Sequence, residues 1–226
     1  MKTKQNILLF LGGRWHDFAG FSHAMNGLFA PQGYLLTETY DANTLCRLTE
    51  VGVDLVISYT CFAEPHPQAP LIGTKRLNAA EVRGLSEWVE RGGALLAVHA
   101  STVLGESPAE LETLLGGAFL SHPEPFAFPV YPLFERHPIT DGIEPFVVYD
   151  EFFIEETAPS IHLHMVAIDR GKAYPMVWSK RAGKGKIVHI AMGHDQRVWG
   201  DSSYQRLLLQ AVEWLLGKKP YTSADC

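Results

Sequence analysis

The chain has 226 residues and is 46% hydrophobic, which is enough apolar material for a complete core and for one large domain or two small ones. Its formal net charge is −6 and it has no long run of lysine or arginine, so nucleic acid is not expected as a partner. The three cysteines, Cys46, Cys61 and Cys226, are odd in number and lack C-x-x-C spacing, which argues against a disulfide framework and predicts a cytoplasmic protein.

The first quarter of the chain alternates strand and helix patterns. Residues 6–11 form an apolar run too short for a secretory signal or a membrane span, and they predict a strand. A helix over 17–29, a strand over 34–40, a helix over 41–52 and a strand over 54–59 follow. This alternation is typical of a doubly wound parallel sheet.

The middle of the chain continues the pattern after a proline-rich loop over 61–75. Asn78 and Glu81 form a capping box that starts a helix ending at Gly92. Residues 94–98 are small or apolar and predict a strand buried on both faces. A second capping box, at Ser107 and Glu110, predicts a short helix ending at Gly116.

The second half is richer in strands. The prolines between 119 and 140 indicate a surface excursion in which any strand lies at an edge or is short. Strand patterns then occupy 144–154, 161–168, 174–179 and 186–191, and a helix covers 203–216. We therefore predict a single α/β domain over 1–226, with a three-layer, mostly parallel, doubly wound sheet extended by antiparallel strands.

Three histidines occur where apolar runs end. His99 directly follows the strand over 94–98, and His16 and His194 follow apolar runs through turns that contain glycine. Ligands of open α/β sheets bind beyond the carboxyl ends of the strands, so these imidazoles are expected to share one crevice. With a carboxylate they would suit a divalent metal, zinc first, in a site of the open, catalytic kind.

Other polar and aromatic residues extend this candidate site. His122 is a further metal candidate, although a histidine before proline is often only a loop residue. Glu151, in the acidic pair after an apolar segment, is a candidate base or ligand, and His99 and His194 are candidate catalytic groups as well. Four aromatic residues next to these positions are candidates for packing against a sugar ring: Trp15, Tyr59, Tyr149 and Trp199. The alternative is that some of them belong to the core.

A nucleophilic mechanism is the competing interpretation. The turn after a central strand often carries serine or cysteine in a G-x-S-x-G or G-x-C-x-G setting. Here His99 stands at that turn and the flanking glycines are absent. Ser101 and Cys61 are therefore weak nucleophile candidates, and glutaminase activity is not expected.

A series of segments resembles the ThuA-like family, named for a trehalose-utilisation protein. The most specific of them is GKGKIVHIAMGHD at 183–195, and the others are 92–100, 121–122, 137–143, 149–151, 175–178 and Trp199. The resemblance implies a flavodoxin-like fold close to that of class I glutamine amidotransferases, with the catalytic cysteine replaced by His99. It carries functional positions onto His16, His99, His122, Glu151 and His194, and it implies a role in carbohydrate use.

These observations lead to two hypotheses from different classes. The first is an enzyme, a hydrolase, lyase or isomerase, that acts on a sugar or keto-sugar derivative by metal-assisted or His/Glu acid–base chemistry. The second is a non-catalytic module that binds a small ligand in an amidotransferase-like crevice. In both, the partner is a small carbohydrate-like molecule, with no nucleotide cofactor and no membrane, and the apolar segment 126–134 suggests a contact between subunits of a homo-oligomer.

Overall fold

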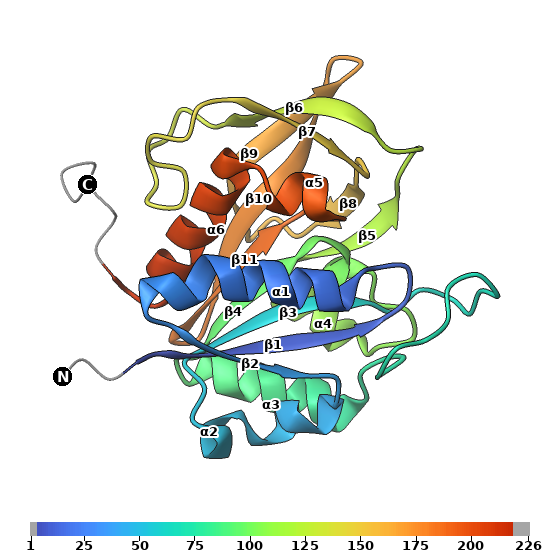
Figure 1. The fold of residues 1–226 in the computed structure, drawn as a ribbon, viewed down its shortest axis with the longest axis vertical. Coiled ribbons are helices and arrows are strands. Elements are labelled where there is room, and N and C mark those ends of the chain that lie inside the picture. The colour runs from blue at the N-terminus through green and yellow to red at the C-terminus, as the bar shows by residue number, and fades with distance from the viewer. Residues whose placement is uncertain (1–3, 219–226) are drawn as a thin grey trace.

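A nine-stranded mixed sheet forms the centre of the computed structural model, which describes residues 4–218 (Figure 1). Its strand order is β2-β1-β3-β4-β11-β10-β9-β6-β7, and β5 and β8 form a separate two-stranded sheet. The strands are β1 (Asn6–Gly13), β2 (Leu35–Thr39), β3 (Leu55–Cys61), β4 (Ala94–Val98), β5 (Gly117–Ser121), β6 (Phe126–Pro132), β7 (Phe146–Asp150), β8 (Ile154–Thr157), β9 (His162–Asp169), β10 (Lys172–Ala182) and β11 (Gly185–Ile190).

Helices cover both faces of the parallel half of the sheet, which gives three layers (Figure 1). The first apolar cluster joins α1 and α6 to one face, and the second joins α3, α4 and η2 to the other. Helices and 3₁₀ turns are α1 (Phe18–Phe29), η1 (Ala30–Gln32), η2 (Ala42–Arg47), α2 (Leu48–Val51), α3 (Ala79–Glu90), η3 (His99–Thr102), α4 (Ala109–Leu115), α5 (Gln196–Trp199) and α6 (Ser202–Leu215).

The parallel half follows the predicted order of elements. β2, β1, β3, β4 and β11 pair in parallel, and β3 and β4 are buried along their whole length, as expected of strands covered on both faces. The α/β class with a mostly parallel sheet extended by antiparallel strands is therefore confirmed. The Asn78–Glu81 capping box is present at the start of α3.

Two local predictions were wrong. The helix expected over 41–52 is a 3₁₀ turn followed by a single α-helical turn, η2 and α2. Ser107 does not cap α4, because its hydroxyl accepts a hydrogen bond from the backbone N–H of Leu77 and Pro108 takes the N-cap position. At Ser107 a contact distant in sequence replaced the expected local bond, whereas Asp41 caps η2 by accepting from the backbone N–H of Asn43.

The antiparallel half corrects the prediction that residues 119–140 form only a surface excursion. β6 lies inside the sheet, where it pairs with β7 over residues 126–130 and with β9 over residues 130–132. Pro129 and Pro132 are tolerated because most of β6 has only one neighbouring strand at a given residue. The local sequence pattern does not predict such a strand, because β6 is held in the sheet by β7 and β9, which come later in the chain.

β7 runs in the same direction as β11, because each of the four strand pairs between them is antiparallel. Its carboxyl end therefore faces the same way as the ends of β1, β4 and β11. The buried Asp150 at the end of β7 accepts a hydrogen bond from the backbone N–H of Gly193, just after β11. Two strands far apart in the sheet order thus meet at one site. None of the helices over residues 4–218 is both long and apolar enough to span a bilayer.

Candidate functional site

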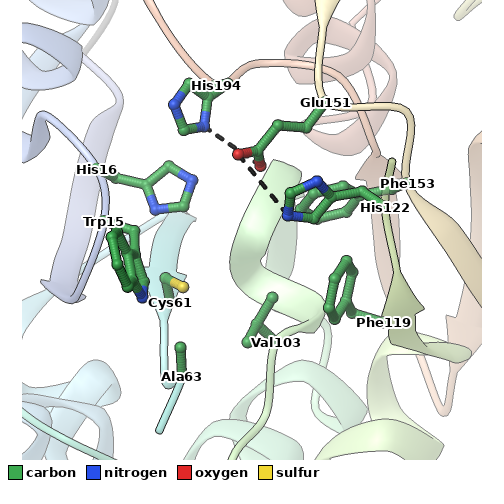
Figure 2. Close-up of a pocket in the computed structure, with 10 residues that line it drawn as sticks. All are labelled: Trp15, His16, Cys61, Ala63, Val103, Phe119, His122, Glu151, Phe153 and His194. Atoms are coloured by element: carbon green, nitrogen blue, oxygen red, sulfur yellow. Dashed lines mark ion pairs between the residues drawn. The ribbon is translucent and has the colours of Figure 1, made fainter. Parts of the chain in front are cut away.

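Four side chains converge beyond the carboxyl ends of β1, β4, β7 and β11. They are His16, His99, Glu151 and His194, and each offers one metal-ligating atom within 4.8 Å of the others. Figure 2 shows His16 and His194 on one side of the Glu151 carboxylate and the ring of His122 on the other. The three strand-end histidines proposed from the sequence therefore lie together, with the expected carboxylate among them.

His99 is fully buried and has one ring nitrogen facing this cluster. Its Nδ1 donates a hydrogen bond to the backbone oxygen of Ala191 at 2.7 Å, which fixes the orientation of the ring. Its Nε2 has no hydrogen-bond partner and lies 3.3 Å from Oε2 of Glu151. The backbone of His99 has a φ of 49°, an uncommon value for any residue other than glycine.

His16 is held in a similar way by a backbone carbonyl. Its Nδ1 donates to the oxygen of Arg14 at 2.9 Å, and its buried Nε2 has no hydrogen-bond partner. Burial, together with the neighbouring rings of His99 and His194, lowers the pKa of His16 to about 3. The ring is therefore neutral near pH 7, which is the form that binds metals.

His194 lies in a loop that several side chains hold in place. Asp150 accepts hydrogen bonds from the backbone N–H groups of Gly193 and His194, at 2.6 and 3.2 Å. The Tyr59 hydroxyl donates to the oxygen of His194 at 2.8 Å, and Trp199 Nε1 donates to the oxygen of Gly193 at 2.6 Å. Nδ1 of His194 is buried without a hydrogen-bond partner and lies 3.3 Å from Oε2 of Glu151.

Glu151 provides the negative charge of the cluster. Burial by itself would raise its pKa, but the imidazoles of His194 and His99, each 3.3 Å from its Oε2, outweigh burial and hold the pKa of this carboxyl well below its usual range. In the same way burial lowers the pKa of His99, but the Glu151 and Asp150 carboxylates outweigh it and raise the pKa above its usual value. A metal ion bound here would compete with a proton for Nε2 of His99.

A pocket of about 420 Å³ is lined by His16, Glu151 and His194, whereas His99 is fully buried and does not line it. Figure 2 shows Trp15 and Cys61 on one wall and Phe119 and Phe153 on the opposite wall. Sequence reasoning missed the two phenylalanines. Phe153 could have been found from its place two residues after Glu151, whereas Phe119 reaches the pocket only through the pairing of β5 with β8.

The four aromatic residues proposed to contact substrate are distributed differently in the structure. Trp15 lines the pocket and is 47% exposed. Tyr59 and Trp199 are buried in the core, where they hold the Gly193–His194 loop as described above. Tyr149 is exposed on β7, where the Arg197 guanidinium packs over its ring and away from the residues that line the pocket.

His122 and the two nucleophile candidates lie outside the four-residue cluster. His122 lines the pocket with Nε2 at 3.8 Å from Oε1 of Glu151, the carboxylate oxygen that the other histidines leave free. Ser101 is buried, and its hydroxyl donates to the backbone oxygen of Ser58 at 2.7 Å. Burial raises the pKa of the Cys61 thiol to about 11, which disfavours the reactive thiolate.

The donor set of the cluster fits a transition metal. Among the described residues, three buried imidazole nitrogens and one carboxylate oxygen converge, and the nitrogens have no hydrogen-bond partner. Nitrogen and carboxylate ligands facing an open pocket are typical of catalytic zinc, and the backbone bonds to His16 and His99 are the usual outer support of such ligands. The types of donor atom in this cluster are therefore those that a transition metal prefers.

Comparisons with known proteins agree with this architecture. No curated protein sequence matches the chain. A ThuA-like protein from Parabacteroides merdae has a TM-score of 0.80 at 15% identity, covering 97% of this chain and 93% of its own, and one from Bacteroides uniformis has 0.72 at 17%, covering 95% and 93%. A β-galactosidase from Rahnella sp. R3 has a TM-score of 0.64 at 15% identity, covering 96% of this chain but 32% of its own.

These solved structures share the fold, and the family is decided by the sequence itself. The model of the ThuA family, described as trehalose utilisation, matches residues 7–215, which include every member of the four-residue cluster and nearly the whole described chain. The protein therefore belongs to the ThuA family.

Proposed function

We propose that this protein is a metal-dependent enzyme that acts on a sugar or keto-sugar derivative, with His16, His99, His194 and Glu151 as the ligands of one zinc ion. One observation carries the proposal. Three imidazole nitrogens are buried without hydrogen-bond partners and meet a carboxylate at the end of an open pocket. Buried polar atoms without partners are costly, so their convergence is best explained by a cation that pairs with all of them.

The chemistry follows from the positions of these groups. A bound zinc ion would supply a Lewis acid that polarises a substrate hydroxyl or carbonyl oxygen. His122 lines the pocket, and its Nε2 lies 3.8 Å from Oε1 of Glu151. We therefore assign His122 the transfer of a proton to or from the substrate. Trp15, Phe119 and Phe153 provide apolar faces for the ring of the substrate.

A carbohydrate substrate is supported by the family description, trehalose utilisation, and by the pairing of apolar walls with a polar end in the pocket. The β-galactosidase from Rahnella contains a region of the same fold, which is a weaker argument in the same direction. We also propose a cytoplasmic location, since Cys46 and Cys61 are free thiols; Cys226 lies outside the described residues.

The deciding experiment is metal analysis of the purified protein by mass spectrometry after reconstitution with zinc. We expect one zinc per chain in the wild type and a loss to about a tenth or less in His99→Ala and in His194→Ala, because each removes one of four ligands. His122→Ala is expected to keep its zinc, since the other four residues supply the ligand set.

His23→Ala is the matched control, because His23 is an exposed histidine on α1 outside the cluster. It should bind zinc as the wild type does. A wild-type protein that takes up no zinc or manganese, or a His99→Ala variant that keeps its full metal content, would contradict the proposal. Metal-free protein would favour the non-catalytic binding module instead.

A further inference from the structure

A second histidine–glutamate pair lies deeper in the fold and is not part of the candidate metal site. His189 on β11 and Glu155 on β8 have no exposed side-chain surface, and Nε2 of His189 lies 3.2 Å from Oε1 of Glu155. The ring of Trp178 packs against His189 at a centroid distance of 4.2 Å. An apolar pair would fill this space at lower cost, because burying charged or polar groups is expensive even when they are paired.

Thr102 connects this pair to the metal site. Its hydroxyl donates a hydrogen bond to Oε1 of Glu155 at 2.6 Å, within the range of bonds to a charged acceptor. Thr102 is the last residue of η3, the 3₁₀ turn that begins with His99. Glu155 therefore joins β8 and β11 to the turn that carries a proposed zinc ligand.

The turn η3 needs such support because His99 is in the left-handed region, where a histidine backbone is strained. Three side chains hold the turn to three different elements. His99 Nδ1 bonds to the end of β11, Ser101 bonds to β3, and Thr102 bonds to Glu155 on β8. The first two bonds constrain the start and the middle of the turn, and the third constrains its end, next to Val103, whose backbone oxygen accepts from the N–H of Phe62.

We propose that Thr102, Glu155 and His189 are positioning residues that fix the η3 turn so that Nε2 of His99 points at the metal cluster. The inference rests on the proposed function for its consequence, which is a preorganised zinc site. His189 holds the Glu155 carboxylate in place, Glu155 accepts from Thr102, and Thr102 sets the end of the turn. Supporting bonds of this kind change metal affinity although they touch no metal.

The test compares the zinc affinity of variants by competition with a chromophoric chelator. Thr102→Val removes the hydroxyl at nearly constant volume and is expected to weaken zinc binding about tenfold. Thr102→Ser keeps the hydroxyl and should bind within about twofold of the wild type. Glu155→Gln removes the charge and should weaken binding several-fold, with no further loss when it is combined with Thr102→Val, because both act through one bond.

Ser22→Ala is the matched control for a purely structural effect. The buried Ser22 hydroxyl donates to Oε2 of the exposed Glu38 at 2.5 Å, so this variant also breaks a hydroxyl–glutamate bond, but a partly buried one on α1 and away from η3. It should lower thermal stability without changing zinc affinity. If Thr102→Val behaves in the same way, the proposed positioning role is overturned.

A second readout keeps the inference separate from the zinc proposal. The hydrogen-bonded Nδ1 proton of His99 should give a downfield imidazole resonance in the metal-free protein, assigned by its loss in His99→Gln. We expect the chemical shift of this resonance to change in Thr102→Val and to keep its wild-type value in Ser22→Ala. If the wild type binds no zinc, the proposed function fails, and an unmoved resonance in Thr102→Val would overturn the positioning role as well.

Discussion

Asp150 is the residue that joins two of the proposed ligands to each other. Its carboxylate accepts three backbone N–H groups, from Glu151, Gly193 and His194, at 2.8, 2.6 and 3.2 Å. Burial raises its pKa, although the neighbouring imidazoles and these hydrogen bonds act in the opposite direction. One side chain thus holds the end of β7 against the loop after β11.

Asp150→Asn should destabilise the protein by about 1 to 3 kcal/mol, because the amide offers one oxygen in place of two and leaves a buried N–H without an acceptor. Urea unfolding measures this change. Asp54→Asn is the control, since Asp54 is exposed and accepts a single N–H, from Asn6 at 2.8 Å. Equal losses in the two variants would contradict the role of Asp150.

On the scale of one element, β9 shows why an alternating pattern did not determine burial. His162 and His164 lie on one face of the strand, so the alternating pattern alone predicts the same environment for both. His162 is exposed, whereas His164 is 2% exposed and bonds to the Ser179 hydroxyl at 2.8 Å. The difference arises because His137, from a segment before the strand, packs over His164 at a ring distance of 4.1 Å.

This packing predicts a pH dependence of stability. Burial, with the rings of His137 and His162, lowers the pKa of His164 to about 3, and Oε2 of Glu135 lies 3.7 Å from Nε2 of His162. The unfolded chain takes up the proton near pH 6.5, so it binds more protons than the folded chain below that pH and stability falls as pH decreases. Between pH 7 and pH 5, His164 alone should cost about 2 kcal/mol.

His164→Gln should remove this contribution, so its unfolding free energy should fall less steeply between pH 7 and pH 5 than that of the wild type. His16 has a similarly lowered pKa and contributes to the slope in both proteins. Urea titrations at several pH values provide the measurement. Identical slopes in the two proteins would show that the folded state protonates His164 at its ordinary pKa.

At the scale of the whole molecule, the proposed metal would join segments far apart in the sequence. Its four ligands follow β1, β4, β7 and β11, and they include both halves of the central sheet. An ion that binds only the folded state stabilises the entire fold by mass action.

Zinc at a hundred times its dissociation constant should therefore add about 2.7 kcal/mol and raise Tm by roughly 5 to 10 °C. A chelator such as EDTA should reverse the shift. Calorimetry with and without zinc measures the shift in Tm. The same scans of His99→Ala serve as the control, because zinc should change the Tm of this variant very little. A wild-type Tm that is indifferent to both zinc and EDTA would count against the metal site.

The sequence by itself determined the order of elements in the parallel half and the histidines at its strand ends. Both depend on local patterns: buried runs, glycine turns and polar residues such as His99 directly after a strand. Only the tertiary structure decided that β7 returns to β11, that His122 lies beside the four-residue cluster, and that Tyr59 and Trp199 are buried. These outcomes depend on pairing between distant strands and on loops packed over them, and neither is encoded in the spacing of neighbouring residues.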